Sequence, residues 1–500
     1  MNYFFNFLFL LLFLKVESKL IFVMTHFRHG ARAPQKFYDK TNYLDYIKEH
    51  WNNPGELTGM GQRMHYLLGI RNRLRYIEEE HFLSESFNPH EILIYSTCIN
   101  RTMISAASQL QGLYPQYINL GESITEEQIR KSIPQVNIDN EIIQNEIKNL
   151  NNYALPYSMI LAPIRMINNN ERKMRLYDID KCKEKTAEIK KNNGLTLDTL
   201  INVIKDFKEK YEEKVNIFYG KKENYDLAFL DNFCDAFISG YTEGRKLKEL
   251  KNAGINSDDL DDFCDKFQVL NFRDWILGDK NHSVAHLESS KLMAEFIHYM
   301  KLRVDADINN EKIDLKYDDY SRPKMLMVSG HDTTISCFEV FLMEAFGKDL
   351  DFYRYPKFAS QIAFEVVRKD ENKSGKNYSD YTVKYYFDDV LFLSTSMQEF
   401  IDKVTPHIWD DKKINEFCGY DNGENDNKDG GDNKDGGDNK KKKKDDDDDD
   451  DDLKNICLII LVSLTVIFLA STILLSIKLI KKNKGESVIN NALIPSTNEE

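Results

Sequence analysis

Three short apolar runs stand out along the chain, and none of them alternates between polar and apolar residues. They are Lys19–Thr25, Glu91–Tyr95 and Lys324–Val328. Runs of this length, rich in aliphatic residues, predict strands that are buried on both faces of a parallel sheet. We therefore expect these segments to share the central sheet of the fold.

Helical spacing follows each predicted strand. Apolar residues recur every three or four positions over Leu57–Tyr76, which predicts a surface helix with one buried face. Ser96-Thr97 is expected to cap a second helix that runs to about Gly112. Thr333–Phe346, after the third strand, is also expected to be helical.

A hairpin is predicted near the C-terminal end of the folded region. Gln361–Val367 and Tyr381–Phe387 alternate between apolar and polar residues, and the polar segment Asn372–Asn377 separates them. Alternation indicates strands with one exposed face, so we place this hairpin at the edge of the sheet.

Residues 136–305 have a different character. Long charged stretches with little β-branched alternation predict a mostly α-helical insertion. Because strand, loop and helix recur on both sides of it, we predict an α/β sandwich whose core is formed by residues 19–135 and 306–418 and which carries residues 136–305 as a helical cap. In such sheets, ligands bind beyond the carboxyl ends of the strands.

The N-terminal segment has the features of a secretory signal. Phe4–Leu14 is an apolar run too short to span a bilayer, and Val16–Ser18 offers small residues for cleavage. We assign residues 1–18 as a signal peptide. The N-terminal amine is the only positive charge before the run, so an uncleaved anchor remains the alternative.

The C-terminal segment predicts a membrane span. Ile456–Ile477 contains 22 residues without a charge, about 33 Å of helix, which is enough to cross a bilayer. We assign residues 453–477 as the transmembrane helix and residues 478–500 as a cytoplasmic tail, because lysines follow the span. A lipid-anchor signal is the competing interpretation, but such a signal ends in its hydrophobic tail, and here a polar segment follows.

This single-pass type I topology places the folded region outside the cell or in the lumen of lysosome-like vesicles, and the sequence does not choose between them. Residues 419–452, built from repeated Asn, Lys, Asp and Gly, predict a disordered acidic and lysine-rich stalk. The remaining segment 19–418 has a net charge of −8, which argues against a nucleic acid as partner.

Six cysteines fall in the exported part, and an even number in an oxidising compartment favours disulfides. None has the spacing of a zinc site, and we expect neither a metal nor another cofactor. Six cysteines allow fifteen connectivities. Among these we prefer Cys182 with Cys418, and Cys234 with Cys264.

The polar residues that follow the three predicted strands suggest phosphate chemistry. Arg28 and Arg32 flank His29, which would keep the imidazole neutral and nucleophilic while the guanidinium groups hold an oxyanion. Arg101 follows the second strand and His331-Asp332 the third. Together the arginines and His331 would bind a phosphate, and Asp332 would donate a proton to the leaving group and later activate water.

Each residue also has an ordinary structural explanation. His26 is most simply a buried core histidine. Arg101 alone could form a salt bridge on a helix, and His331-Asp332 alone could cap the following helix. None of these explanations accounts for three clusters that all end buried strands.

The motifs resemble those of the histidine acid phosphatases, branch two of the histidine phosphatase superfamily, over about residues 19–405. They are Arg28-His29-Gly30-x-Arg32-x-Pro34, Leu57-Thr58-x-x-Gly61, the segment around Arg101 to Pro115, and Ser329-Gly330-His331-Asp332-Thr333-Thr334. The resemblance implies a three-layer α/β sandwich with a phosphoglycerate mutase-like core and an inserted helical cap. It also implies a phosphohistidine on His29, phosphate binding by Arg28, Arg32, Arg101 and His331, and proton donation by Asp332.

Two departures affect what the resemblance can predict. Cys98 and Asn100 stand where the family usually has acids, and the insertion lacks a recognisable motif. The substrate therefore stays open between a small-molecule and a lipid phosphate monoester. A homodimer also stays open, and a non-catalytic type I membrane receptor for a phosphorylated ligand is the rival hypothesis.

Glycosylation is a further expectation for an exported chain. Four sequons occur, at Asn100, Asn281, Asn372 and Asn377. A glycan at Asn100 would obstruct the pocket around Arg101, so we expect that site to stay unmodified. Asn372 and Asn377, in the predicted hairpin turn, are the better candidates.

Overall fold

A seven-stranded mixed sheet with the order β3-β2-β4-β1-β5-β6-β7 forms the centre of the protein. The strands are β1 (Lys19–Arg28), β2 (Ile92–Thr97), β3 (Arg165–Ile167), β4 (Met325–Gly330), β5 (Gln361–Arg368), β6 (Tyr381–Phe387) and β7 (Val390–Ser396). The first four strands in this order are parallel, and β5, β6 and β7 continue the sheet in antiparallel pairs. The three predicted parallel strands are thus neighbours.

The computed structural model describes residues 18–35, 51, 53–115, 125–132, 141–153, 155, 161–167, 182, 185, 188–189, 194–219, 226–244, 251–277, 282–311, 322–347, 355–370 and 374–419. Apart from residues at their borders, the predicted signal peptide, stalk, membrane span and tail lie outside this part. Within it, each helix is too short or too polar to cross a bilayer.

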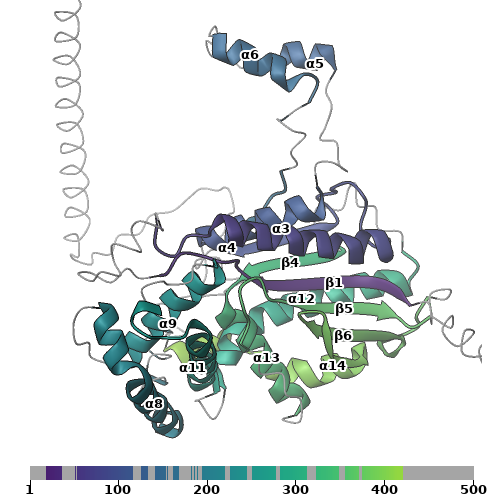
Figure 1. Ribbon diagram of the computed structural model, residues 1–500. Coiled ribbons are helices and arrows are strands. Elements are labelled where there is room, and N and C mark those ends of the chain that lie inside the picture. The colour runs from purple at the N-terminus through teal and green to yellow at the C-terminus, as the bar shows by residue number, and fades with distance from the viewer. Residues whose placement is uncertain are drawn as a thin grey trace, which may run out of the picture. The chain divides into compact units, whose positions relative to one another are not determined.

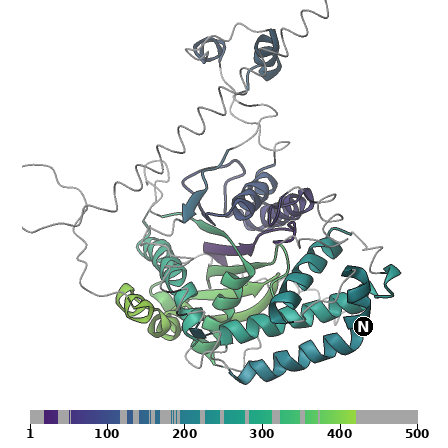
Figure 2. The same cartoon turned by 90° about the vertical axis from the view of Figure 1, so that its left-hand side faces the viewer.

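Helices cover both faces of the sheet, which confirms the predicted three-layer α/β sandwich (Figures 1 and 2). On one face lie α3 (Gly59–Arg73) and α4 (Asn100–Leu113). A π-helical turn, Leu74–Glu79, directly continues α3. On the other face lie α12 (Ser283–Ile308), α13 (Asp332–Phe346) and α14 (Met397–Val404).

The side chains of β1 pack against the helices on both faces of the sheet. Val23 and Phe27 face α3 and α4, whereas Phe22 and Met24 face the opposite layer. Ile21 faces the same layer as Phe22 because a register irregularity interrupts the pairing with β5 between residues 20 and 22. Burial of the strand on both faces explains why its sequence is a continuous apolar run.

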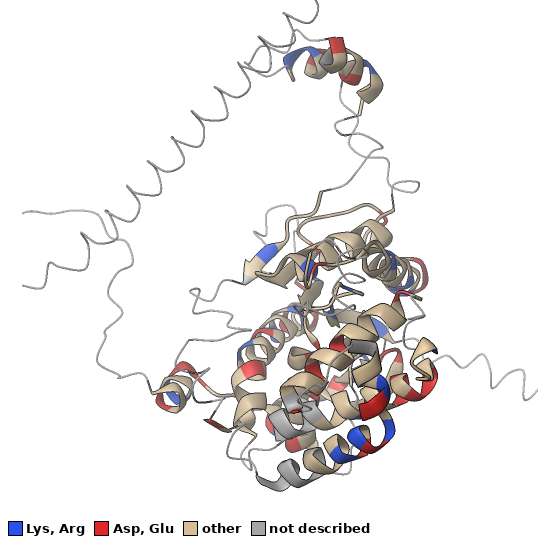
Figure 3. Cartoon of the chain, turned by 60° about the vertical axis from the view of Figure 1, so that its left-hand side comes forward, with Lys and Arg blue, Asp and Glu red and all other residues tan. Residues whose placement is uncertain are grey.

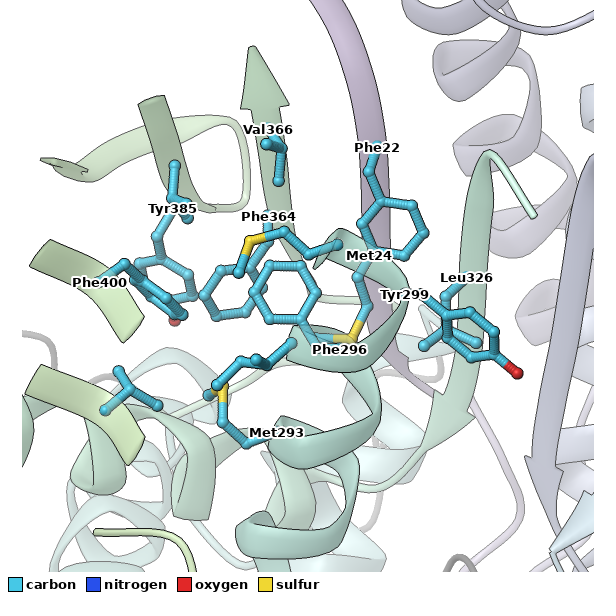
Figure 4. Close-up of a cluster of buried hydrophobic side chains, with 14 of the residues drawn as sticks. Phe22, Met24, Met293, Phe296, Tyr299, Leu326, Phe364, Val366, Tyr385 and Phe400 are labelled. Atoms are coloured by element: carbon cyan, nitrogen blue, oxygen red, sulfur yellow. The ribbon is translucent and has the colours of Figure 1, made fainter. Parts of the chain in front are cut away.

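The larger core cluster lies between the sheet and α12 (Figure 4). Phe296 of α12 stacks on Phe22 at 5.9 Å between ring centroids and contacts Phe364 of β5 at 4.8 Å. Such aromatic pairs add to the stabilisation that burial alone provides. Helix α12 therefore belongs to the packed layers of the sandwich, although its residues fall mostly within the predicted cap, and the division at residues 136 and 305 stays a prediction.

Three further helices of the insertion form a second core: α8 (Gly194–Tyr219), α9 (Leu227–Thr242) and α11 (Ser257–Leu277). Phe207, Phe233 and Phe267 are buried between them. The predicted disulfide Cys234–Cys264 joins α9 to α11.

Charged residues of both signs lie mainly on the helices, as Figure 3 shows. The short helix α6 (Glu141–Leu150) also falls in the insertion, and the short helix α5 (Glu126–Lys131) precedes it.

The last helix, α15 (Asp411–Cys418), is held by the second predicted disulfide, Cys182–Cys418. Trp409 and Ile414 are buried beside this bridge. Both preferred cysteine pairings are confirmed. Of the other two cysteines between residues 19 and 418, Cys98 is exposed and Cys337 is buried, and neither forms a disulfide within the described part of the chain.

Two local predictions were wrong. Ser96 and Thr97 end β2 and do not cap α4, whose N-cap is Ile99 without a side-chain hydrogen bond. The predicted hairpin is not at the sheet edge, because β7 pairs with β6 and forms that edge. The turn between β6 and β7 is Asp388-Asp389, with positive φ at both residues, where Asn-Gly would be the usual signal.

Candidate active site

The ends of three parallel strands bring the predicted site residues together. In the register of β1 and β4, Arg28 lies opposite Gly330, so His29 and His331 leave adjacent strands side by side. Their rings are 5.5 Å apart between centroids. Strand β2 lies on the other side of β4, and α4, which follows it, carries Arg101 in its first turn. These residues lie at the edge where an α/β sheet binds ligands.

His29 is buried, with 2% of its surface exposed. Its Nδ1 lies 2.9 Å from the carbonyl oxygen of Gly30. A carbonyl can only accept a hydrogen bond, so Nδ1 carries the proton and the lone pair of the neutral ring is on Nε2. The backbone thus fixes the tautomer that a nucleophilic Nε2 requires.

The electrostatic surroundings keep this imidazole neutral. Burial lowers the pKa of His29 well below 6.5, and the charges of Arg28, Arg32, His331 and Arg101 lower it further. Each cation would repel a proton on the ring. The nucleophilic form is therefore present even in mildly acidic solution.

Arg28 is held rigidly by the chain around it. Its guanidinium group donates to the carbonyl oxygen of Pro356 at 2.6 Å and pairs with the carboxylate of Asp332 at 2.7 Å. The ring of Phe358 lies 4.3 Å from the guanidinium carbon. Cation–π contact and fixed hydrogen bonds orient the remaining N–H groups before any ligand binds.

Arg32 is paired with a residue that the sequence did not indicate. Its guanidinium donates to both carboxylate oxygens of Asp235, at 2.6 and 3.4 Å. The same carboxylate accepts the backbone N–H of Gln35 at 2.8 Å. Asp235 belongs to α9, so the helical insertion reaches the arginine motif that follows β1.

Arg101 supplies a cation without a carboxylate partner among the described residues. Burial, together with repulsion from Arg32 and Arg28, lowers its pKa to about 10. Its Nε has no hydrogen-bond partner in the described part of the chain. Such a destabilised cation gains most from an incoming anion.

His331 is 6% exposed, and its Nε2 lies 3.1 Å from the hydroxyl of Thr97 at the end of β2. Burial and the nearby Arg101 lower its pKa to about 4. His331 therefore enters the site as a neutral ring. Thr97 joins the site residues that sequence reasoning missed.

Asp332 is the first residue of α13 and faces Arg28. Burial alone would raise the pKa of this carboxyl, but Arg28, His331 and Arg32 outweigh burial and lower it. The hydroxyl of Tyr355 donates to its Oδ2 at 3.3 Å, and the N–H of Thr333 donates to Oδ1 at 2.9 Å. Beside these cations, Asp332 is therefore ionised.

Two glycines allow the motif after β1 to pack against α3. A side-chain carbon at Gly30 would fall on the backbone of Gly61, and one at Gly61 would fall on the backbone of Ala31. The N–H of Gly30 also donates to the hydroxyl of Ser105 in α4, at 3.1 Å. The spacing Leu57-Thr58-x-x-Gly61 thus has a steric reason close to His29.

Residues 355–360 form a wall of the site that sequence reasoning also missed. The ring of Phe358 lies 5.8 Å from that of His29. The N–H of Ala359, which has a φ of 61°, donates to the carbonyl oxygen of His29 at 3.2 Å. A left-handed alanine is uncommon and carries strain. The loop is therefore held against the motif by specific contacts.

His26 is a buried core histidine, as predicted. It is fully buried, and its Nε2 contacts the hydroxyl of Thr334 at 3.0 Å. Burial lowers its pKa to about 3.

The sequence-family model of the histidine phosphatase superfamily (branch 2) matches residues 19–388. The chain belongs to this family. The match covers the sheet up to β6 and all six predicted site residues.

Several curated proteins are similar over shorter stretches. A lysosomal acid phosphatase of Xenopus laevis is 39% identical over 100 residues, which are 20% of this chain and 22% of the relative. A human prostatic acid phosphatase is 40% identical over 116 residues, which are 22% of this chain and 28% of the relative. The matches thus span only about a quarter of each relative.

Among solved structures, the apo form of the Hafnia alvei phytase is similar over 80% of this chain and 98% of its own. The TM-score is 0.47 and the sequence identity 14%. A phytase from Citrobacter braakii gives a TM-score of 0.48 with 13% identity.

Proposed function

We propose that the protein is a phosphomonoester hydrolase that acts through a phosphohistidine on His29. One observation carries the proposal: the Nε2 lone pair of a buried, neutral imidazole lies among Arg28, Arg32, Arg101 and His331. This arrangement suits a nucleophile that attacks a phosphoryl group while cations neutralise the nonbridging oxygens. Membership in the histidine phosphatase superfamily and similarity to acid phosphatases support it.

The charges of the site suggest how Asp332 becomes a proton donor. Three guanidinium groups, those of Arg28, Arg32 and Arg101, face two carboxylates, Asp332 and Asp235. A phosphate dianion and Asp235 together would balance the three cations, which leaves no counter-charge for an ionised Asp332. Asp332 would therefore hold a proton once the substrate is bound, and the substrate monoanion can bring that proton with it.

The proposed reaction has two balanced steps. His29 Nε2 forms a bond to phosphorus as the ester P–O bond breaks, and Asp332 gives its proton to the leaving alkoxide. Ionised Asp332 then takes a proton from a water molecule, whose oxygen attacks phosphorus and breaks the N–P bond. Inorganic phosphate and neutral His29 are the products. Arg28, Arg32, Arg101 and His331 bind the phosphoryl oxygens throughout.

The substrate class is a small-molecule or lipid phosphate monoester, and the insertion that carries Asp235 forms part of the site that would select it. A non-catalytic receptor for a phosphorylated ligand remains the rival. Binding alone does not need a tautomer-fixed nucleophile or an acid beside Arg28, which favours the enzyme.

We further propose that the enzyme is a type I membrane protein. Residues 1–18 would be its signal peptide, residues 453–477 its span, and residues 478–500 its cytoplasmic tail, with the catalytic part extracellular or in lysosome-like vesicles. The two disulfides support an oxidising compartment. Of the described sequons, Asn377 is exposed beside a turn and is a candidate for glycosylation, whereas Asn100 donates to Glu56 next to Arg101.

The deciding experiment measures phosphate release by the full-length chain, purified in detergent, from an aryl phosphate without added metal. His29→Ala should abolish turnover, whereas His298→Ala, at an exposed histidine of α12, should not change it. A rapid alkaline quench of the wild-type enzyme should trap a phosphoryl group on His29, detectable by mass spectrometry. Full turnover in His29→Ala would refute the mechanism, and saturable ligand binding without phosphate release would favour the receptor.

A further inference from the structure

Away from the candidate active site, three histidines converge on one carboxylate. His286 Nε2 and His282 Nδ1 lie 3.0 and 3.1 Å from Oε2 of Glu344, and His407 Nδ1 lies 3.4 Å from Oε1. His282 and His286 come from the start of α12, Glu344 from the last turns of α13, and His407 from the turn Thr405–His407. Three separate chain segments therefore meet here.

The hydrogen bonds of His286 create a conflict that a cation would resolve. Its Nδ1 lies 2.7 Å from the backbone carbonyl oxygen of His407, so Nδ1 must carry the proton. The lone pair of Nε2 in the neutral ring then points at a carboxylate oxygen 3.0 Å away. Two lone pairs repel at this distance unless a proton or a metal ion lies between them.

The surroundings of Glu344 also favour a bound cation. All three ion pairs of its carboxylate are with histidines, and no described lysine or arginine pairs with it. The ligand atoms of His286, Glu344 and His407 lie within 4.8 Å of one another. In a tetrahedral zinc site with ligands at about 2.0 Å, neighbouring ligand atoms are about 3.3 Å apart. The distances from the histidine nitrogens to the carboxylate oxygens of Glu344, 3.0 to 3.4 Å, are close to that spacing.

The ring of His286 is also fixed as metal-binding histidines usually are. An Nδ1–H bond to a carbonyl leaves Nε2 available to a metal and sets the ring orientation. The indole of Trp409 stacks on this ring at 5.2 Å between centroids with an interplanar angle of 9°. Little reorganisation would then be needed for binding.

We propose that His286, His407 and Glu344 bind a divalent transition-metal ion of the zinc class, and that His282, which also contacts Glu344, lies beside this site. Imidazole nitrogens with a carboxylate oxygen are a donor set that suits zinc. The site is structural. Glu344 follows Asp332 by 12 residues on α13, which is about 18 Å along a helix. The ion would fasten the segment that contains His407 and Trp409 to α12 and α13.

The test uses the full-length chain, stripped with a chelator and then equilibrated with Zn²⁺ alone. The wild type should retain about one zinc per chain, and zinc should raise its melting temperature. His407→Gln and Glu344→Gln should weaken zinc binding at least tenfold and lose the thermal shift. Matched controls are His298→Gln on the same helix and His29→Ala in the active site, both of which should keep the zinc.

Two measurements distinguish loss of the site from loss of the fold. His407→Gln and Glu344→Gln should retain phosphatase activity, because the cluster includes none of the candidate active-site residues. Co²⁺ bound to the wild type should give the visible absorption of a tetrahedral site, and the two variants should not. If the active wild type retains no zinc after equilibration, or if the variants bind zinc as tightly as the wild type, the cluster is a protonated histidine–carboxylate network and the proposal is wrong.

Discussion

The guanidinium group of Arg32 and the carboxylate of Asp235 join the motif after β1 to helix α9 through a two-pronged ion pair. Both side chains are shielded from solvent, at 4% and 20% exposure. Such pairs fix geometry as well as charge. The helical insertion thereby helps to determine the orientation of an arginine that we propose binds phosphate.

Asp235→Asn should lower kcat/KM for an aryl phosphate by about tenfold or more, because a misplaced binding group can cost up to about 100-fold. Asp235 acts through Arg32, so the loss should largely disappear in an Arg32→Lys background, as a double-mutant cycle would measure. Asp231→Asn, at an exposed position of the same helix, is the control. Additive losses in the cycle would show that Asp235 does not position Arg32.

The pH dependence of kcat/KM should reflect the ionisation of the substrate phosphate rather than that of His29. Burial and neighbouring cations keep the pKa of His29 well below 6.5, and Arg28 helps to keep the pKa of Asp332 below 3.8, so neither changes protonation near neutrality. The proton for the leaving group would then arrive on the substrate monoanion. The rate should fall as pH rises through the second pKa of the phosphate ester, about 6.

Phosphate esters with different second pKa values test whether the proton comes from the substrate. The alkaline limb of the profile should move with the ester, and Asp332→Asn should slow alkyl esters more than aryl esters, because poor leaving groups need the proton most. An alkaline limb at one fixed pH for all esters, or equal losses for both ester types, would contradict the assignment of Asp332.

Phe358→Leu should lower kcat/KM about 5- to 30-fold, since a partly desolvated cation–π contact contributes about 1–2 kcal/mol. The ring lies against Arg28, Arg32 and His29. Phe392→Leu, on the edge strand β7, should leave the rate unchanged. A rate equal to wild type in Phe358→Leu would mean that the loop does not preorganise the site.

His26→Gln should reduce the loss of stability in acid. The folded-state pKa of His26 is about 3, below the unfolded value of 6.5, so the neutral ring favours folding above pH 6.5 and this advantage is lost as pH falls from 6.5 toward 3. At pH 5 the difference is about 2 kcal/mol. Denaturant unfolding at pH 7 and pH 5 measures it. A variant with the same pH slope as wild type and as the His298→Gln control would contradict the expectation.

The central sheet could be predicted from sequence because β1, β2 and β4 are buried on both faces and therefore read as uninterrupted apolar runs. Strand β3 spans only three residues, too few for a periodic pattern. Strand β7 was missed because its turn uses Asp388-Asp389 in place of the usual glycine signal.

The residues of the candidate site were also only partly predictable from the sequence. Arg28, His29 and His331 follow predicted strands, so their proximity follows from parallel pairing. Asp235 lies 203 residues from Arg32 within an insertion that has no recognisable motif. Its carboxylate reaches Arg32 only when α9 is packed in place. That packing depends on the second core and on the disulfide Cys234–Cys264.

The bridge between Cys182 and Cys418 closes a loop whose ends are 236 residues apart. Tension between the two ends of the chain would cross this covalent link, so the backbone between the two cysteines, which carries Asp332 and Glu344, would not itself be stretched. If the chain is tethered beyond Gly419 as proposed, a pull on the tether could therefore not straighten this part of the polypeptide.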